Sequence, residues 1–181
     1  MFIITPIKVE DASGDVKLLY KKIQKALGFV PPHFELFATI DIQSLKDFVE
    51  YNLYFSKHPK INADILPFLR LCIAQKECRR YCIAFNTKML VSSGANKEVL
   101  SDIGSKIQEL PFSIEQKLIL SKVLYAIYNA DKFCKDDLQE LYSADFTDKD
   151  FYELLSYATN FMAKSKMIEV YINNAKIAHH N

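Results

Sequence analysis

Two cysteines with cationic neighbours are the residues of this sequence best suited to covalent chemistry. Cys78 and Cys82 lie four positions apart in the segment KECRRYC, with Arg79 and Arg80 between them. A positive charge or a helix N-terminus beside a cysteine lowers the thiol pKa and favours the thiolate, which is the nucleophilic form. The pattern therefore indicates a nucleophilic or redox-active thiol.

The same spacing also fits a structural role. Two cysteines four residues apart fall on one face of a helix, where small apolar side chains usually serve packing. In a continuous helix a disulfide between them is unfavourable, because the Cβ atoms lie about 5 to 6 Å apart while a disulfide needs about 3.5 to 4.5 Å. Redox pairing of Cys78 with Cys82 thus requires a helix that begins or breaks between them.

Other kinds of site lack their usual patterns. The 4 histidines are His33, His58, His179 and His180, and none lies within a turn of a cysteine, so we expect no metal site. The glycines are too dispersed for a phosphate-binding loop, and we expect no cofactor. A serine hydrolase would have to use His33 or His58 as its base, and both lie at expected turns.

Length and charge narrow the classes of protein and partner. The chain has 181 residues, 50% of them hydrophobic, which fits a single domain over residues 1–181 with its own core. The 23 basic and 22 acidic residues nearly cancel, which argues against a nucleic-acid partner. The opening segment lacks the features of a secretory signal, and no stretch approaches the roughly 20 apolar residues of a membrane span. We expect a cytoplasmic protein with no membrane partner.

The hydrophobic pattern is helical throughout and predicts an all-α fold, because apolar residues recur three and four positions apart. A helix should end at Gly28, and Ser113 with Gln116 and Thr147 with Asp150 have the spacing of capping boxes. The predicted helices cover residues 16–27, 33–39, 45–55, 66–90 as one or two helices, 99–107, 114–128 and 151–162, with a final segment to about Ile177. The segment 66–90 is apolar on several faces and should form the core.

Most of the chain resembles the alkylhydroperoxidase D and carboxymuconolactone decarboxylase superfamily. The family's entry helices are similar to GFVPPHFELFATIDIQSLKDFVEY, and its hallmark helix, with a Cys-x-Tyr-Cys-x-x-x-His motif, is similar to LRLCIAQKECRRYCIAFNTK. Its later helices are similar to LSKVLYAIYNADKFCKDDLQELYSADFTDKDFYELLSYATNFMAKSKMIEV. The resemblance implies an all-α bundle of alkylhydroperoxidase D type that assembles into a homo-oligomer.

The motif is degenerate in this chain. In such enzymes the second cysteine attacks a hydroperoxide, and a His four residues on, relayed to an upstream Glu, takes its proton. An ungapped alignment places Arg79 at the first Cys, Asn86 at the His and Pro67 near the Glu, and Asn cannot act as a base at neutral pH. The candidate residues that follow are Cys82 as the catalytic thiol, Cys78 as the candidate resolving thiol, and Arg79, Arg80, Tyr81 and Asn86 as supporting residues.

Two hypotheses of function remain open. The first is a divergent, antioxidant thiol-dependent peroxidase in which Cys82 reacts with a hydroperoxide, and Cys78 or an external thiol reductant resolves the sulfenic acid. The second is a catalytically inactive relative that serves as an oligomeric scaffold or a small-molecule binding protein. Decarboxylase-like chemistry and an unrelated helical bundle are further alternatives. Fast alkylation of Cys82 would favour the first hypothesis, and slow alkylation the second.

Overall fold

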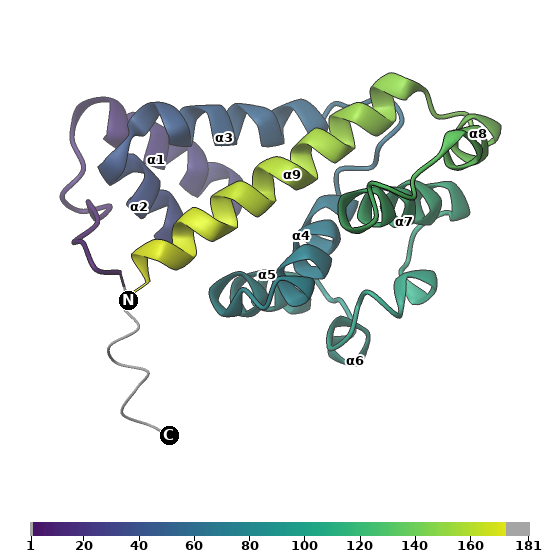
Figure 1. The fold of residues 1–181 in the computed structure, drawn as a ribbon. Helices are drawn as coiled ribbons and strands as arrows, with labels where there is room; N and C mark the ends of the chain where they lie inside the picture. Colours follow the sequence, from purple (N-terminus) through teal and green to yellow (C-terminus); the bar gives the residue numbers. More distant parts are fainter. Residues whose placement is uncertain (1, 173–181) are drawn as a thin grey trace. The chain divides into compact units, whose positions relative to one another are not determined.

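The computed structural model describes residues 2–172, and within this range the chain forms helices and no strand (Figure 1). The helices are α1 (Gly14–Leu27), α2 (Pro32–Ile40), α3 (Ile42–Phe55), α4 (Ile65–Lys76), α5 (Arg80–Ser92), α6 (Lys97–Leu100), the 3-10 helix η1 (Ile107–Glu109), α7 (Ile114–Tyr128), α8 (Lys135–Ser143) and α9 (Asp148–Tyr171). The prediction of an all-α fold is confirmed. The segment predicted to continue to Ile177 lies outside the described residues.

The chain divides into two compact units. One comprises the residues up to Tyr54 together with the segment from Val170, and the other comprises Phe55–Glu169. Each unit has its own buried apolar side chains, among them Tyr20 in the first and Leu69 in the second. That residues 1–181 form a single domain stays a prediction.

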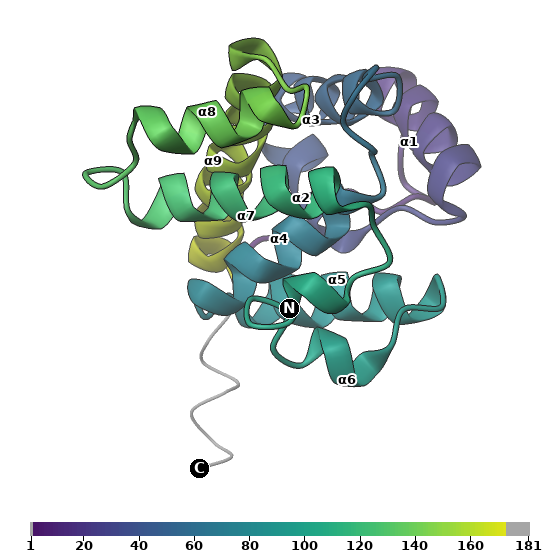
Figure 2. The same ribbon diagram turned by 90° about the vertical axis from the view of Figure 1, so that its right-hand side faces the viewer.

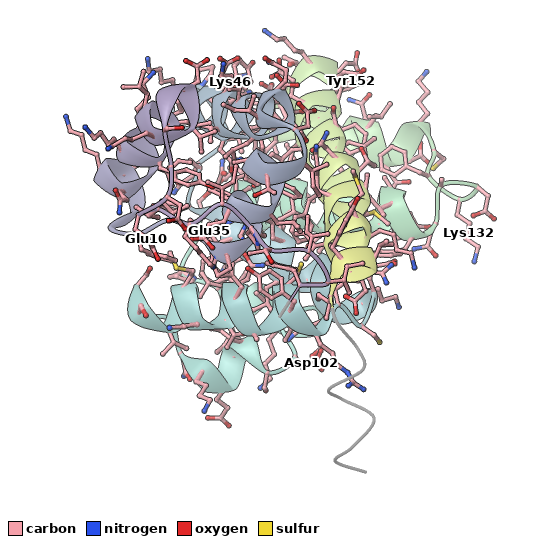
Figure 3. The ribbon with its side chains drawn as sticks, turned by 90° about the vertical axis from the view of Figure 1, so that its left-hand side faces the viewer. Glu10, Glu35, Lys46, Asp102, Lys132 and Tyr152 are labelled. Carbon is pink, nitrogen blue, oxygen red and sulfur yellow. The ribbon has the colours of Figure 1, made fainter. Side chains whose placement is uncertain are left out.

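The first unit is organised by α1, α2 and α3. As predicted, α1 ends at Gly28, whose φ of 81° lies in the left-handed region that glycine adopts without strain. The hydroxyl of Tyr20 donates to the backbone oxygen of Ile7 at 3.0 Å. The buried Glu35, labelled in Figure 3, forms an ion pair of 2.6 Å with Lys8. These bonds hold the N-terminal segment against the helices of this unit.

The second unit is built around α4. This helix packs against α5 and α7, and α8 lies beside α7 (Figure 2). Side chains on every side of α4 are buried, including Leu66, Leu69 and Ile73, so the prediction that the segment 66–90 forms a core is confirmed for its first half. The segment consists of two helices, with the break at residues 77–79.

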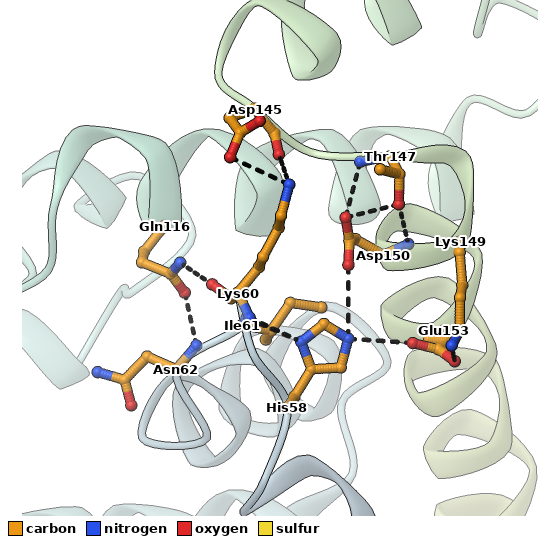
Figure 4. A network of polar contacts seen from close by, with 10 residues as sticks. All are labelled: His58, Lys60, Ile61, Asn62, Gln116, Asp145, Thr147, Lys149, Asp150 and Glu153. Atoms are coloured by element: carbon orange, nitrogen blue, oxygen red, sulfur yellow. Dashed lines mark hydrogen bonds and ion pairs between the residues drawn. The ribbon is translucent and has the colours of Figure 1, made fainter.

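Of the two predicted capping boxes, one is complete and the other is formed only in part. At the start of α9 the box is complete, because Asp150 Oδ2 accepts the backbone N–H of Thr147 at 2.7 Å and Thr147 Oγ1 accepts that of Asp150 at 3.2 Å. At the start of α7, Ser113 Oγ accepts the N–H of Gln116 at 3.4 Å. The Gln116 side chain instead accepts the N–H of Asn62 at 2.9 Å, which ties α7 to the segment before α4 (Figure 4).

The prediction of a helix over residues 99–107 is wrong. Only Lys97–Leu100 and Ile107–Glu109 are helical in this stretch. The side chain of Gln75 donates to the backbone oxygen of Leu100 at 2.8 Å and accepts the N–H of Ile103 at 3.3 Å, so these backbone groups are satisfied without a continuous helix. The apolar spacing persists because Leu100 and Ile103 remain buried in the turns.

Candidate functional site

The connection between α4 and α5 separates the two candidate cysteines. Cys78 has a φ of 54°, in the left-handed region, and its N–H donates to the backbone oxygen of Gln75 at 3.1 Å. The N–H of Arg79 donates to the oxygen of Ala74 at 2.8 Å. These two bonds define a Schellman motif, with Cys78 at the position that glycine usually occupies. Cys78 therefore lies in the turn, and the spacing rule for a continuous helix does not apply to it and Cys82.

Cys82 lies in the first turn of α5 and is 4% exposed, whereas Cys78 is exposed. Burial, and to a smaller extent the nearby Glu169, raise the pKa of Cys82 to about 12. The charges of Arg79 and Arg70 lower the pKa of Cys82 without overcoming burial. Arg80 is exposed and is not among the charges that shift this pKa. The Cys82 thiol is thus protonated at neutral pH, contrary to what its cationic sequence neighbours suggest.

The neighbours Arg79 and Tyr81 have structural partners. Arg79 Nη2 forms an ion pair of 3.2 Å with Glu77, and its buried Nε has no hydrogen-bond partner among the described residues. The ring of Tyr81 stacks on that of Phe85, with 6.2 Å between the centroids. Arg79 is therefore engaged by Glu77, and its charge still lowers the pKa of Cys82 more than that of Arg70 does.

Asn86 crosslinks the site. It is 2% exposed, its Nδ2 donates to the backbone oxygen of Cys82 at 2.8 Å, and its Oδ1 accepts a bond of 3.0 Å from Arg70 Nε. A second nitrogen of Arg70, Nη1, donates to the hydroxyl of Tyr157 on α9. The sequence reasoning missed Arg70 and Tyr157, although an arginine within the apolar run LPFLRLCIA of α4 was a usable signal.

The other two cysteines, Cys72 and Cys134, lie in or at the start of helices other than α5. Cys72 is buried within α4, and burial raises its pKa to about 12. Cys134 is exposed at the N-cap of α8, where its N–H donates to Asp137 at 2.9 Å. No described cysteine is in a disulfide. Cys134 therefore provides a matched control, because it is also a cysteine at a helix N-terminus.

His58 is a structural residue of the second unit (Figure 4). Its side chain is 2% exposed, its Nδ1 accepts the N–H of Ile61 at 2.9 Å, and its Nε2 faces Glu153 at 3.0 Å and Asp150 at 3.6 Å. Both ring nitrogens are engaged, so His58 is not placed to act as a base on a substrate. His33, the other histidine considered, is also buried.

Metal and membrane sites have no support in the described range. Residues 2–172 contain no group of three or more His, Cys, Asp or Glu side chains placed to hold a metal ion. No helix within these residues has the length and hydropathy needed to cross a membrane.

The arrangement of helices is that of the alkylhydroperoxidase AhpD core. The chain is similar, at 15% identity and a TM-score of 0.72, to a solved "alkylhydroperoxidase AhpD core" structure of a peroxidase-related protein from Ralstonia eutropha JMP134, over 92% of this chain and 88% of that one. It is also similar to a peroxidase-related protein from Silicibacter sp. TM1040, with a TM-score of 0.71 and 15% identity over 96% and 89% of the two chains. No family model and no curated protein matches the chain. At this identity the likeness establishes the fold.

Proposed function

We propose that this chain is a thiol-dependent peroxidase-like redox protein that uses Cys82 and Cys78 as a pair. In the proposed cycle the Cys82 thiolate attacks the O–O bond of a hydroperoxide, which gives the Cys82 sulfenic acid and, after proton uptake from water, an alcohol. The Cys78 thiol then attacks the sulfenic sulfur, so that a disulfide forms and water leaves. An external dithiol reduces the disulfide and is itself oxidised, which restores both thiols.

The helix break at residues 77–79 is the observation that supports this pairing. Cys78 immediately precedes Arg79, the N-cap of α5, and Cys82 lies in the first turn. Because Cys78 lies in the turn, the Cβ separation of residues four apart in a continuous helix does not limit its approach to Cys82. Because Cys78 is exposed, it is also the thiol of the pair that an external reductant can reach. The AhpD-like fold, shared with proteins described as peroxidase-related, is consistent with the proposal.

The buried environment of Cys82 sets the rate of the proposed reaction. A thiol with a pKa of about 12 has little thiolate at neutral pH, so the first step is slow there and accelerates as the pH rises. In this proposal the protein works in the cytoplasm as a homo-oligomer, with a hydroperoxide substrate and a thiol reductant as its partners.

Cysteine variants test the proposal through hydroperoxide consumption in the presence of a dithiol. Cys82→Ser should abolish consumption, whereas Cys134→Ser should leave it unchanged. Cys78→Ser should allow one oxidation of Cys82 that a sulfenic-acid trap captures, because the resolving thiol is missing. Equal loss in the Cys82 and Cys134 variants would show that the effect is structural and would contradict the assignment.

The second candidate function is a catalytically inactive scaffold or small-molecule binding protein. The burial of Cys82 favours it, as does the use of Asn86 as a crosslink where the resemblance predicts a base. Alkylation of native Cys82 that is slow at every pH, together with no consumption of hydroperoxide, would favour this candidate over the redox one.

A further inference from the structure

A cation without a carboxylate partner stands near Cys82. Arg70 donates from Nε to Asn86 Oδ1 at 3.0 Å and from Nη1 to the hydroxyl of Tyr157, and both acceptors are neutral. None of the ion pairs found among residues 2–172 includes Arg70. An arginine guanidinium keeps its positive charge in proteins. Its charge is therefore not neutralised by an acidic side chain in direct contact.

The helix geometry of α5 directs this charge toward Cys82. Cys82 and Asn86 are four residues apart, so their side chains share one face of the helix. Arg70 binds the Asn86 side chain on that face, and Asn86 in turn binds the backbone oxygen of Cys82 at 2.8 Å. Cys82 and Asn86 are 4% and 2% exposed, so water screens the charge less than it would on the surface.

Two other charges act on Cys82. Arg79 lowers its pKa more than Arg70 does but is engaged in an ion pair of 3.2 Å with Glu77, and Glu169 carries the same sign as a thiolate and opposes its formation. Arg70 lowers the pKa of Cys82, which agrees with the direction expected from its position. Of these two arginines, Arg70 is thus the one that forms no ion pair with an acidic side chain of residues 2–172.

We propose that Arg70 is the positioning residue that stabilises negative charge on Cys82, in place of a proton relay. This inference rests on the proposed function. A guanidinium does not accept a proton, so it acts through its charge on the thiolate and on the alkoxide that leaves when the O–O bond breaks. The thiol proton passes to water, and water reprotonates the alkoxide. Asn86 and Tyr157 hold the guanidinium in place.

The test compares two alkylating reagents of similar size on the full-length chain. Iodoacetate is anionic and iodoacetamide is neutral, and both need the Cys82 thiolate and access to it. The ratio of their rates at Cys82, measured by peptide mass spectrometry, therefore cancels thiolate content and exposure and reports the local charge. The rate ratio at Cys134, measured in the same sample, serves as the internal reference.

Arg70→Met should lower the iodoacetate-to-iodoacetamide ratio at Cys82 by about fourfold or more, because removing one nearby positive charge in a water-like dielectric is worth on the order of 1 kcal/mol. Arg70→Lys keeps the charge and should retain most of the ratio. The matched control, Arg80→Met, removes an exposed arginine of the same helix turn as Cys82 and should leave the ratio unchanged.

An unchanged ratio in Arg70→Met, or an equal fall in Arg80→Met, would overturn the inference. If Arg70→Met does not fold, Tyr157→Phe removes one bond to the guanidinium and should still lower the ratio. In that case, an unchanged ratio in Tyr157→Phe would overturn the inference. Hydroperoxide turnover is measured in parallel. A lowered ratio without turnover rejects the peroxidase function alone, and turnover with an unchanged ratio rejects the role of Arg70 alone.

Discussion

Replacing Cys78 with glycine should stabilise the protein while it disables the proposed redox cycle. A non-glycine residue pays roughly 1–2 kcal/mol in the left-handed region, where Cys78 has a φ of 54°. Glycine loses about 0.5–1 kcal/mol through the greater freedom of the unfolded chain. The net gain lies between about 0 and 1.5 kcal/mol, which for a chain of this length raises Tm by up to roughly 6 °C.

Urea unfolding and thermal melting measure this gain, and trapping of sulfenic acid on Cys82 measures the loss of the resolving thiol. Cys78→Ser is the control for the thiol, because it retains a Cβ at the same φ and should leave the unfolding free energy within about 0.5 kcal/mol of wild type. Gly94→Ala is the control for the backbone, since Gly94 has a φ of 91° and the substitution should destabilise. A fall in Tm on Cys78→Gly would refute the reasoning.

Four further predictions concern pH, stability, restored chemistry and assembly. Alkylation of Cys82 should rise about tenfold per pH unit from about pH 7 to pH 10, because its pKa of about 12 lies above this range, and a plateau below about pH 9 would contradict this. His58→Ala should cost about 3 kcal/mol in urea unfolding, since it removes a buried ring that bonds Glu153 and the backbone N–H of Ile61, and a loss under about 1 kcal/mol would be too small. The double variant Arg79→Cys, Asn86→His should raise hydroperoxide turnover above wild type. The gain should be smaller than the about 10² to 10⁴ of a well-placed base, because Arg70 disfavours a protonated imidazole at position 86. Turnover equal to wild type would contradict this prediction. Sedimentation should show a homo-oligomer at micromolar concentration, and a stable 20.9 kDa monomer would exclude one.

The helices could be predicted where local signals determine them. Gly28 ends α1 and the pair Thr147 and Asp150 begins α9, because a left-handed glycine and a capping box act within a few residues. The helix predicted over residues 99–107 failed because Gln75, more than two dozen positions earlier, bonds its backbone groups. The apolar periodicity of this stretch thus predicted correctly which residues are buried, but it predicted the wrong backbone conformation.

The chemical state of Cys82 could not be predicted from its neighbours in the sequence. The adjacent arginines indicated a lowered pKa, but burial by the surrounding helices has the larger effect and raises it. Two of the charges that act on this thiol, Arg70 and Glu169, come from α4 and the end of α9. These helices approach α5 only in the folded protein, so the sequence around Cys82 gives no sign of either charge.

The three Schellman motifs of the second unit give an internal comparison for Cys78. The N–H of Ala95 donates to Leu90, with Gly94 at the left-handed position, and that of Phe146 donates to Leu141, with Asp145 there. Glycine and aspartate are residues that adopt this conformation at low energy, and cysteine is not. The motif itself would therefore be more stable without Cys78. Cys78 is exposed and precedes the turn that carries Cys82, so its unfavourable backbone conformation is consistent with the proposed role of its thiol.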